Sequence, residues 1–100
     1  MPYIVMRKFE WDGDKAAANR RKHRVSFEAA TLVFDDPLKL TVLDDRFDYG
    51  ETREITIGRV QDRVLAVIHT DREGKTRIIS ARRASPSEVR AYCQVHPGSG

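Results

Sequence analysis

The sequence predicts one α+β domain, in which two N-terminal helices pack on one face of a mostly antiparallel sheet and a short helix ends the chain. Helix signals fill the first third of the chain and return near its end. Between them, strand-like segments follow one another with connections too short to contain a helix, which favours antiparallel pairing. The length of 100 residues suits one domain, which we place at residues 1–95, and residues 96–100 are predicted to be a disordered tail.

The composition is that of a soluble globular protein and excludes several other classes. Charged residues make up 33% and hydrophobic residues 40% of the chain, which is not the balance of a disordered protein. The longest apolar run, Val64 to Ile68, is too short to cross a bilayer, and the N-terminus lacks the order of a signal peptide, so we expect a cytoplasmic protein. The single Cys93 cannot form an internal disulfide, and the three scattered histidines have no metal-ligand spacing, so no cofactor is expected.

Capping residues place the first two helices. Asp12-Gly13-Asp14 is a turn after the strand-like segment Phe9 to Trp11, and it supplies the N-cap of a helix that runs to about His23. The side chains expected toward the core are Ala16, Ala17 and Asn19. Ser26 is the N-cap of a second helix, which Pro37 ends. Its apolar residues recur at helical spacing, at Phe27, Ala30, Val33 and Phe34.

The rest of the chain alternates in the manner of strands until a final capped helix. Gln61-Asp62 suits a tight hairpin turn, and Asp71 to Lys75 contains a Gly where a second hairpin needs a positive φ. Ser85 and Pro86 form the start of a helix. The strands are expected at 38–43, 53–60, 63–70 and 76–83, and the last helix at 86 to about 94.

Pairing across the Gln61-Asp62 turn defines two faces of the sheet. If Val60 lies opposite Arg63, then Glu54 lies opposite His69 and Ile55 opposite Ile68. We expect the two helices on the face formed by Ile55, Ile57, Val64, Ala66 and Ile68. The other face is expected to present to solvent or a ligand the side chains of Glu54, Thr56, Val67 and His69.

The register of the last hairpin is left open by the sequence. A loop that spans Asp71 to Lys75 adds Arg77 and Arg83 to the face of His69, and a loop one residue shorter adds Ser80 and Arg82. The choice matters because the segment Lys75 to Tyr92 holds five of the 18 Lys and Arg residues and one of the 15 Asp and Glu residues. This localised charge favours a polyanionic partner.

A histidine beside arginines on an open face is typical of RNA cleavage. A base must take the proton of the ribose 2′-hydroxyl, and cations must surround the reacting phosphate. His69 is therefore the candidate base or acid, with Glu54 beside it. The alternative is that His69 is an ordinary strand residue and Glu54 its salt partner. Phosphate ligands are expected at Arg77, Arg82 and Arg83, with Tyr92 in support or simply packed.

Further RNA contacts are expected around this face. The basic run Arg20 to Arg24 can track a phosphate backbone, or it can be the solvated end of a helix. The residues expected to bind RNA are Arg53, Lys75, Ser80, Lys22 and His23.

Several segments, in order, resemble the BrnT toxins of bacterial type II toxin–antitoxin modules. The resemblance extends from Phe9 to Tyr92. Its most specific segments are Phe9-Glu10-Trp11-Asp12, Lys22-His23, Val25-Ser26-Phe27-Glu28-Ala29-Ala30, Ile57-Gly58 and Arg77-Ile78-Ile79-Ser80-Ala81-Arg82-Arg83-Ala84. The other matching residues are Lys15-Ala16, Asn19, Val33-Phe34, Asp36-Pro37, Arg53, Glu88 and Tyr92. One departure is Arg24, where the family commonly has Gly. A Gly there would end the first helix in the left-handed conformation, which Arg24 can adopt only at some cost. The alternatives are that the turn is altered or that Arg24 adds to the basic charge of the surface.

The resemblance implies a RelE-like ribonuclease fold and a toxin that cleaves RNA, blocks translation and needs no metal. It also implies a co-encoded antitoxin, usually with a ribbon-helix-helix DNA-binding part, through which the complex binds operator DNA. The alternative from another class is a basic binding module that grips RNA or an acidic partner segment without cutting it. Cleavage of a labelled RNA separates the two.

Overall fold

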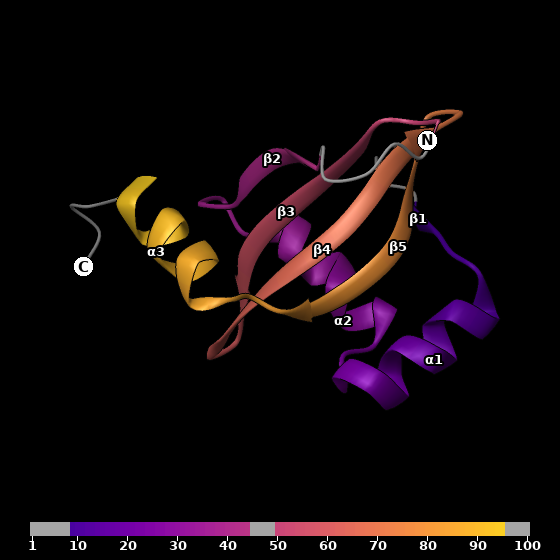
Figure 1. The fold of residues 1–100 in the computed structure, drawn as a ribbon, viewed down its shortest axis with the longest axis horizontal. Helices are drawn as coiled ribbons and strands as arrows, with labels where there is room; N and C mark the ends of the chain where they lie inside the picture. The colour runs from indigo at the N-terminus through magenta and orange to yellow at the C-terminus, as the bar shows by residue number, and fades with distance from the viewer. Residues whose placement is uncertain (1–8, 45–49, 96–100) are drawn as a thin grey trace, which may run out of the picture.

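The computed structural model describes residues 9–44 and 50–95, and in them helices lie against a five-stranded sheet (Figure 1). The strand order is β1-β5-β4-β3-β2, with every pair antiparallel except β1 with β5. The predicted α+β class is confirmed, while the expected tail at 96–100 lies outside the described residues. The elements are β1 (Phe9–Glu10), α1 (Gly13–His23), α2 (Phe27–Thr31), η1 (Leu32–Asp35, a 3-10 helix), β2 (Leu40–Asp44), β3 (Arg53–Val60), β4 (Arg63–Arg72), β5 (Lys75–Arg83) and α3 (Pro86–Val95).

The predicted capping residues begin the first two helices. The side chain of Asp12 accepts hydrogen bonds from the backbone N–H groups of Asp14 and Lys15, and Ser26 Oγ accepts one from Ala29 N at 3.0 Å. The second helix is shorter than its apolar pattern, because α2 tightens into η1 before the chain turns at Asp36. Ala17, expected toward the core, is exposed. Cap chemistry therefore predicts where these helices start better than which side chains they bury.

The pairing of β3 with β4 follows the predicted register. Val60 lies opposite Arg63, Ile55 opposite Ile68 and Glu54 opposite His69. Gln61 takes a φ of 58° in the turn between the two strands, as a two-residue hairpin turn requires.

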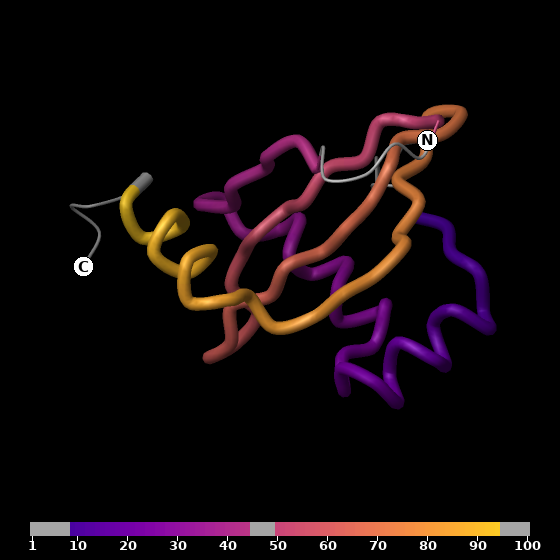
Figure 2. The backbone as a smooth tube through the Cα atoms, in the orientation of Figure 1, coloured from indigo at the N-terminus to yellow at the C-terminus, as the bar shows by residue number. Residues whose placement is uncertain are grey.

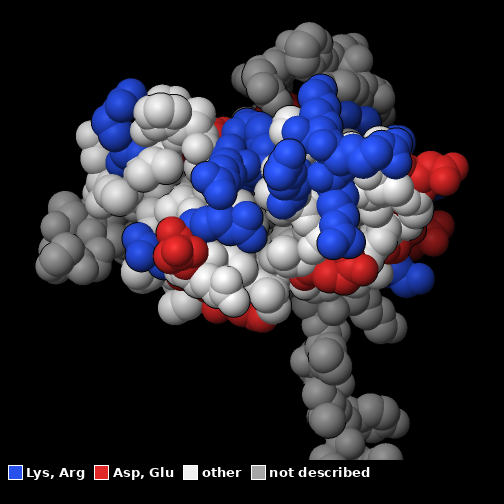
Figure 3. Space-filling model, turned by 90° about the horizontal axis from the view of Figure 1, so that it is seen from below, with Lys and Arg blue, Asp and Glu red and all other residues white. Residues whose placement is uncertain are grey.

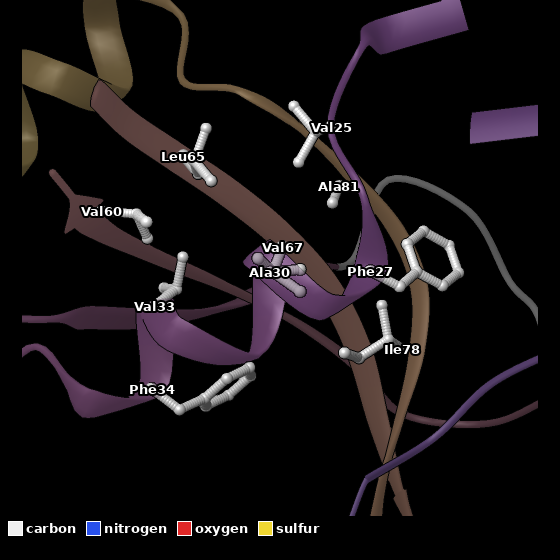
Figure 4. Packing of buried hydrophobic residues seen from close by; sticks show 10 residues of the cluster. All are labelled: Val25, Phe27, Ala30, Val33, Phe34, Val60, Leu65, Val67, Ile78 and Ala81. Carbon is white, nitrogen blue, oxygen red and sulfur yellow. The ribbon is translucent and has the colours of Figure 1, made fainter. Parts of the chain in front are cut away.

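The faces of the sheet were predicted the wrong way round. Leu65 and Val67 pack with α2 and η1 in one cluster, which Figure 4 shows between the helical ribbon and the sheet. Ala66 and Ile68, which alternate with them along β4, pack with Ile55, Ile57 and Tyr92 of α3 in a second cluster. The helices α2 and η1 therefore cover the face of Val67 and His69, and that face is closed to solvent where it was expected to be open. Thr56 and Val67 are 0% exposed there.

A β-bulge decides the register of β5 against β4. His69 lies opposite Ile78 but Ile68 lies opposite Ser80, so Ile79 is an extra residue in β5. The hairpin turn itself is Glu73-Gly74, shorter than either expected loop. Beyond the bulge, β5 curves along its length and leads into α3 (Figure 2). Neither expected pairing is therefore right. Arg83, opposite Leu65, is on the face of His69, whereas Arg77 and Arg82 are on the other.

Candidate functional site

His69 lies in the core and not on an open face. Its side chain is 4% exposed, and its ring meets the ring of Phe34 edge to face at 4.9 Å between centroids. Its Nε2 is hydrogen bonded to Thr56 Oγ1 at 2.7 Å, and Thr56 Oγ1 is in turn 2.8 Å from Thr41 Oγ1 on the edge strand. Glu54 lies beside His69 on β3 and is partly exposed. A buried imidazole beneath an aromatic ring has no direct access to an RNA strand.

The residues expected to form one site lie at two ends of the sheet. Arg77 lies opposite Thr70 and Lys75 opposite Arg72, near the end where β4 turns into β5. Arg53 is at the same end, one residue before Glu54, which lies opposite His69. Arg82 and Arg83 lie at the opposite end of β5. Lys75 and Arg83 are the two ends of this nine-residue strand. Extended strand of this length spans roughly 26 Å. Glu10 also neutralises Arg77 across 3.1 Å. The structure thus splits the expected site in two.

Arg82 is tied to the start of α3. Its guanidinium donates to both carboxylate oxygens of Glu88, at 2.7 and 3.0 Å, in a bidentate pair. Glu88 also accepts from Ser85 N at 2.8 Å while Ser85 Oγ accepts from Glu88 N, which is a capping box. The hydrogen bond from Arg82, against the opposing effect of burial, holds the pKa of Glu88 below its ordinary value. Arg82 therefore positions α3, and Arg83 next to it is the exposed arginine of this end.

Tyr92 uses its hydroxyl inside the protein. The hydroxyl donates to Asp36 Oδ2 at 2.6 Å, and the residue is 6% exposed. Burial, followed by this bond to a carboxylate, raises the pKa of Tyr92. Burial by itself raises the pKa of Asp36, but the donors Tyr92 OH, Arg59 N and Leu38 N outweigh it, so the pKa lies below 3.8. Of the two roles expected for Tyr92, the geometry favours packing.

Asn19 joins α1 to the outer edge of β5. Its amide nitrogen donates to the carbonyl oxygens of Ala81 at 2.8 Å and Val25 at 3.0 Å, and its amide oxygen accepts from Ala81 N at 3.2 Å. The side chain thus pairs with Ala81 as a neighbouring strand would. Ser80 Oγ donates to the same amide oxygen at 3.2 Å, so Ser80 is part of this junction. The basic end of α1 is therefore held beside the basic end of β5.

The junction creates a continuous basic surface. Figure 3 shows Lys and Arg side chains gathered over the side of the molecule on which α1 and the end of β5 lie in Figure 1. Glu28 of α2 borders it, in a hollow shared with Arg20 and Arg21. His23 is partly buried on the last turn of α1. The term basic surface refers below to the exposed side chains of Arg20, Arg21, Lys22, Arg24 and Arg83.

Sequence reasoning missed two residues that organise this site. Asn19 was expected toward the core, but its partner is 62 positions away in the sequence. Asp36, the residue before the helix-ending Pro37, was given no role, although its carboxylate joins η1, β3 and α3. An Asn on the buried side of a helix indicates a satisfied amide, because buried polar groups are hydrogen bonded. That signal does not name the partner.

The described residues contain neither a candidate metal site nor a candidate membrane-spanning helix. They contain no group of three or more His, Cys, Asp or Glu side chains that could hold a metal ion. No helix within the described ranges has the length and apolar character needed to span a membrane.

Comparison with known families identifies the chain. The model of the ribonuclease toxin BrnT of type II toxin–antitoxin systems matches residues 11–88. The chain belongs to the BrnT family. None of the curated proteins matches it. BrnT proteins are ribonuclease toxins, so an RNA target and a cognate antitoxin are the partners that membership implies. The matched range contains α1, β5 and the first turn of α3, and thus the whole basic surface.

Proposed function

We propose that this BrnT-family chain is a RelE-like endoribonuclease that cleaves RNA without a metal ion and thereby blocks translation. The observation that carries the proposal is the junction of Asn19 with Ala81, which holds the arginines of α1 beside Arg83. Guanidinium groups bind phosphate bidentately and stay charged at every physiological pH. A surface of this kind supports the binding of an RNA strand and the stabilisation of a reacting phosphate.

Arg83 and His23 are the residues best placed for the chemistry. Arg83 is exposed, whereas Arg82 is engaged by Glu88. His23 follows Asn19 by four residues, so both side chains lie on the side of α1 that meets β5. In the proposed reaction, His23 takes the proton from a ribose 2′-hydroxyl and the 2′-oxygen attacks the adjacent phosphorus. The bond from phosphorus to the 5′-oxygen breaks, a 2′,3′-cyclic phosphate forms, and the leaving 5′-oxygen takes a proton from water. Arg83 neutralises the charge that develops on the phosphate oxygens.

His69 takes a structural role in this proposal. Replacing it by Ala removes the ring beneath Phe34 and the hydrogen bond to Thr56. The variant is therefore expected to lose stability, and a loss of cleavage would not identify a catalytic group. Exposed residues of the basic surface give cleaner tests.

Cleavage of a labelled RNA by the purified protein, with and without ribosomes and in the presence of EDTA, tests the proposal. The wild type should cleave despite the chelator, and Arg83→Ala should cleave about 100-fold more slowly. Arg72→Ala removes another exposed charge, at the far end of β4, and should cleave as the wild type does. Persistent cleavage by Arg83→Ala would remove our site, and an inactive wild type would favour the binding module.

We further propose that a co-encoded antitoxin with a ribbon-helix-helix part neutralises the toxin and carries it to operator DNA. The local excess of positive charge supports an antitoxin segment that brings acidic residues to the basic surface. Association should then slow as salt screens the charges. Operator DNA should bind the complex and the antitoxin but not the toxin alone. An association rate independent of salt would contradict the electrostatic part of this proposal.

A further inference from the structure

Arg24 holds a backbone conformation that costs an L-residue free energy. It caps α1 with φ 60° and ψ 30°, in the left-handed region that favours glycine, and its N–H donates to Arg20 O at 2.9 Å. A glycine would make the same turn and the same backbone hydrogen bond without this strain. The backbone turn therefore does not require an arginine. The reason for one lies in the surroundings of its side chain.

The side chain of Arg24 completes a hollow lined by arginine alone. Arg20, Arg21 and Arg24 surround it at the C-terminal end of α1. The ion pairs among the described residues engage Arg53, Arg77 and Arg82, and none of them involves these three. The three arginines that line this hollow thus form no ion pair in the part of the chain that the structure describes, and Glu28 lies in the neighbouring hollow. Mutual repulsion of this kind is relieved when a polyanion binds.

The lining favours a phosphate backbone over a peptide. Peptide recognition relies on buried apolar anchors that fill pockets, and this hollow is lined by three arginines with no apolar residue among them. Phosphate oxygens match the planar donor fork of arginine. The hollow also lies on the same basic surface as Arg83, which Asn19 holds beside α1. An RNA strand whose reacting phosphate lies at Arg83 can extend along this end of α1.

We propose that Arg20, Arg21 and Arg24 form a phosphate-binding subsite for single-stranded RNA, separate from the reacting phosphate. The inference rests on the proposed ribonuclease function, whose RNA substrate it extends along α1. The subsite adds affinity for the backbone without reading bases, so its contribution depends on salt and not on sequence. Arg24 is its distinctive member, since the chain accepts backbone strain to keep a cation there.

Binding of an uncleavable RNA tests the subsite independently of cleavage. The probe is a short 2′-O-methyl RNA of mixed sequence, which lacks the attacking hydroxyl, and its affinity for the full chain is measured over a series of salt concentrations. Arg24→Gly should weaken binding roughly threefold or more and lower the salt slope by ~0.7, the value for one lost contact to a single strand. The double variant Arg20→Ala/Arg21→Ala should lower the slope by about twice as much.

Two controls separate the side chain from the backbone and from net charge. Gln61→Gly relieves a φ of 58° in the β3–β4 turn without changing charge, and Arg72→Ala removes an exposed charge from the far end of β4. Both should bind the probe as the wild type does. Equal losses in Arg24→Gly and Arg72→Ala would overturn the subsite, because net charge alone would then explain binding.

The two proposals fail in different ways. A wild type that cleaves RNA, with probe binding unchanged in Arg24→Gly, removes the subsite and leaves the ribonuclease proposal intact. A wild type that cleaves no RNA but loses probe binding in Arg24→Gly removes the ribonuclease proposal and leaves the subsite. If Arg24→Gly weakens binding of the cognate antitoxin but not of the RNA probe, the three arginines bind an acidic protein segment and the RNA assignment is wrong.

Discussion

The hydroxyl of Tyr92 donates a hydrogen bond to Oδ2 of Asp36 across 2.6 Å and so joins α3 to the end of η1. The same oxygen accepts from Arg59 N at 2.8 Å, and Oδ1 accepts from Leu38 N at 2.8 Å. One carboxylate therefore connects the two layers that cover opposite faces of the sheet. Because its donors come from three parts of the chain, Asp36 stabilises the fold where β3 extends beyond β2.

Removing the hydroxyl in Tyr92→Phe should affect stability and not cleavage. The ring can keep its packing against Ile57 and its neighbours, while Asp36 loses one of its donors. The free energy of unfolding should fall by about 1 kcal/mol, a typical value for one hydrogen bond. Urea unfolding gives this value, and cleavage is measured under conditions where both proteins are folded. A large loss of cleavage at unchanged stability would show that Tyr92 contacts the substrate after all.

The ion pair of Arg82 with Glu88 makes stability depend on acid pH. Folding holds the pKa of Glu88 below 4.5, chiefly through the hydrogen bond from Arg82. The pair therefore contributes its full stability above 4.5 and loses it as the pH falls through the lower folded-state pKa. Glu88→Gln should cost about 1 kcal/mol at neutral pH. Its difference from the wild type should shrink on acidification, and a constant difference over the pH series would contradict this origin.

The pairing of β3 with β4 could be predicted from the sequence, whereas the face of the sheet that the helices cover could not. A two-residue turn fixes the register of β3 with β4 locally. The strand β4 then has apolar residues on both sides, with Leu65 and Val67 on one and Ala66 and Ile68 on the other. A strand buried on both faces carries no polar side to mark solvent. The position of His69 was therefore assigned to the wrong environment.

The sequence predicted several residues of the candidate site, but it did not predict which contact brings them together. Alternation counted from the β4–β5 turn does not predict which face each side chain of β5 occupies. The bulge at Ile79 reverses the alternation, so the turn does not determine the faces of Arg82 and Arg83. The basic run of α1 and the basic end of β5 are each visible in the sequence. What brings them together is one amide, Asn19, acting across 62 positions. Local periodicity carries no information about that contact.

Gly58 should tolerate no side chain, because η1 packs directly against it. A Cβ there would lie 2.9 Å from Val33 Cγ1, closer than such atoms approach, and 3.0 Å from Val33 O, which is a tight contact. Gly58→Ala should therefore lower the free energy of unfolding by about 1–3 kcal/mol. Gly13→Ala is the matched control, since nothing lies within 4 Å of its Cβ position. Thermal unfolding of the two variants compares them, and equal melting temperatures would mean that η1 moves aside without cost.

Asn19→Ala should separate the two halves of the basic surface. It leaves Ala81 N and the carbonyl oxygens of Ala81 and Val25 without their side-chain partner, in a buried junction. The expected cost is about 2–3 kcal/mol, because buried backbone groups lose their hydrogen bonds. Near-complete loss of RNA cleavage should follow even where urea titration shows that the protein is still folded. Asn19→Asp keeps the acceptor for Ala81 N but sets a carboxylate oxygen against the carbonyl oxygens of Ala81 and Val25, so it should be at least as destabilising as Asn19→Ala. If Asn19→Ala cleaves RNA normally while folded, the arginines of α1 and Arg83 act independently and the junction is only structural.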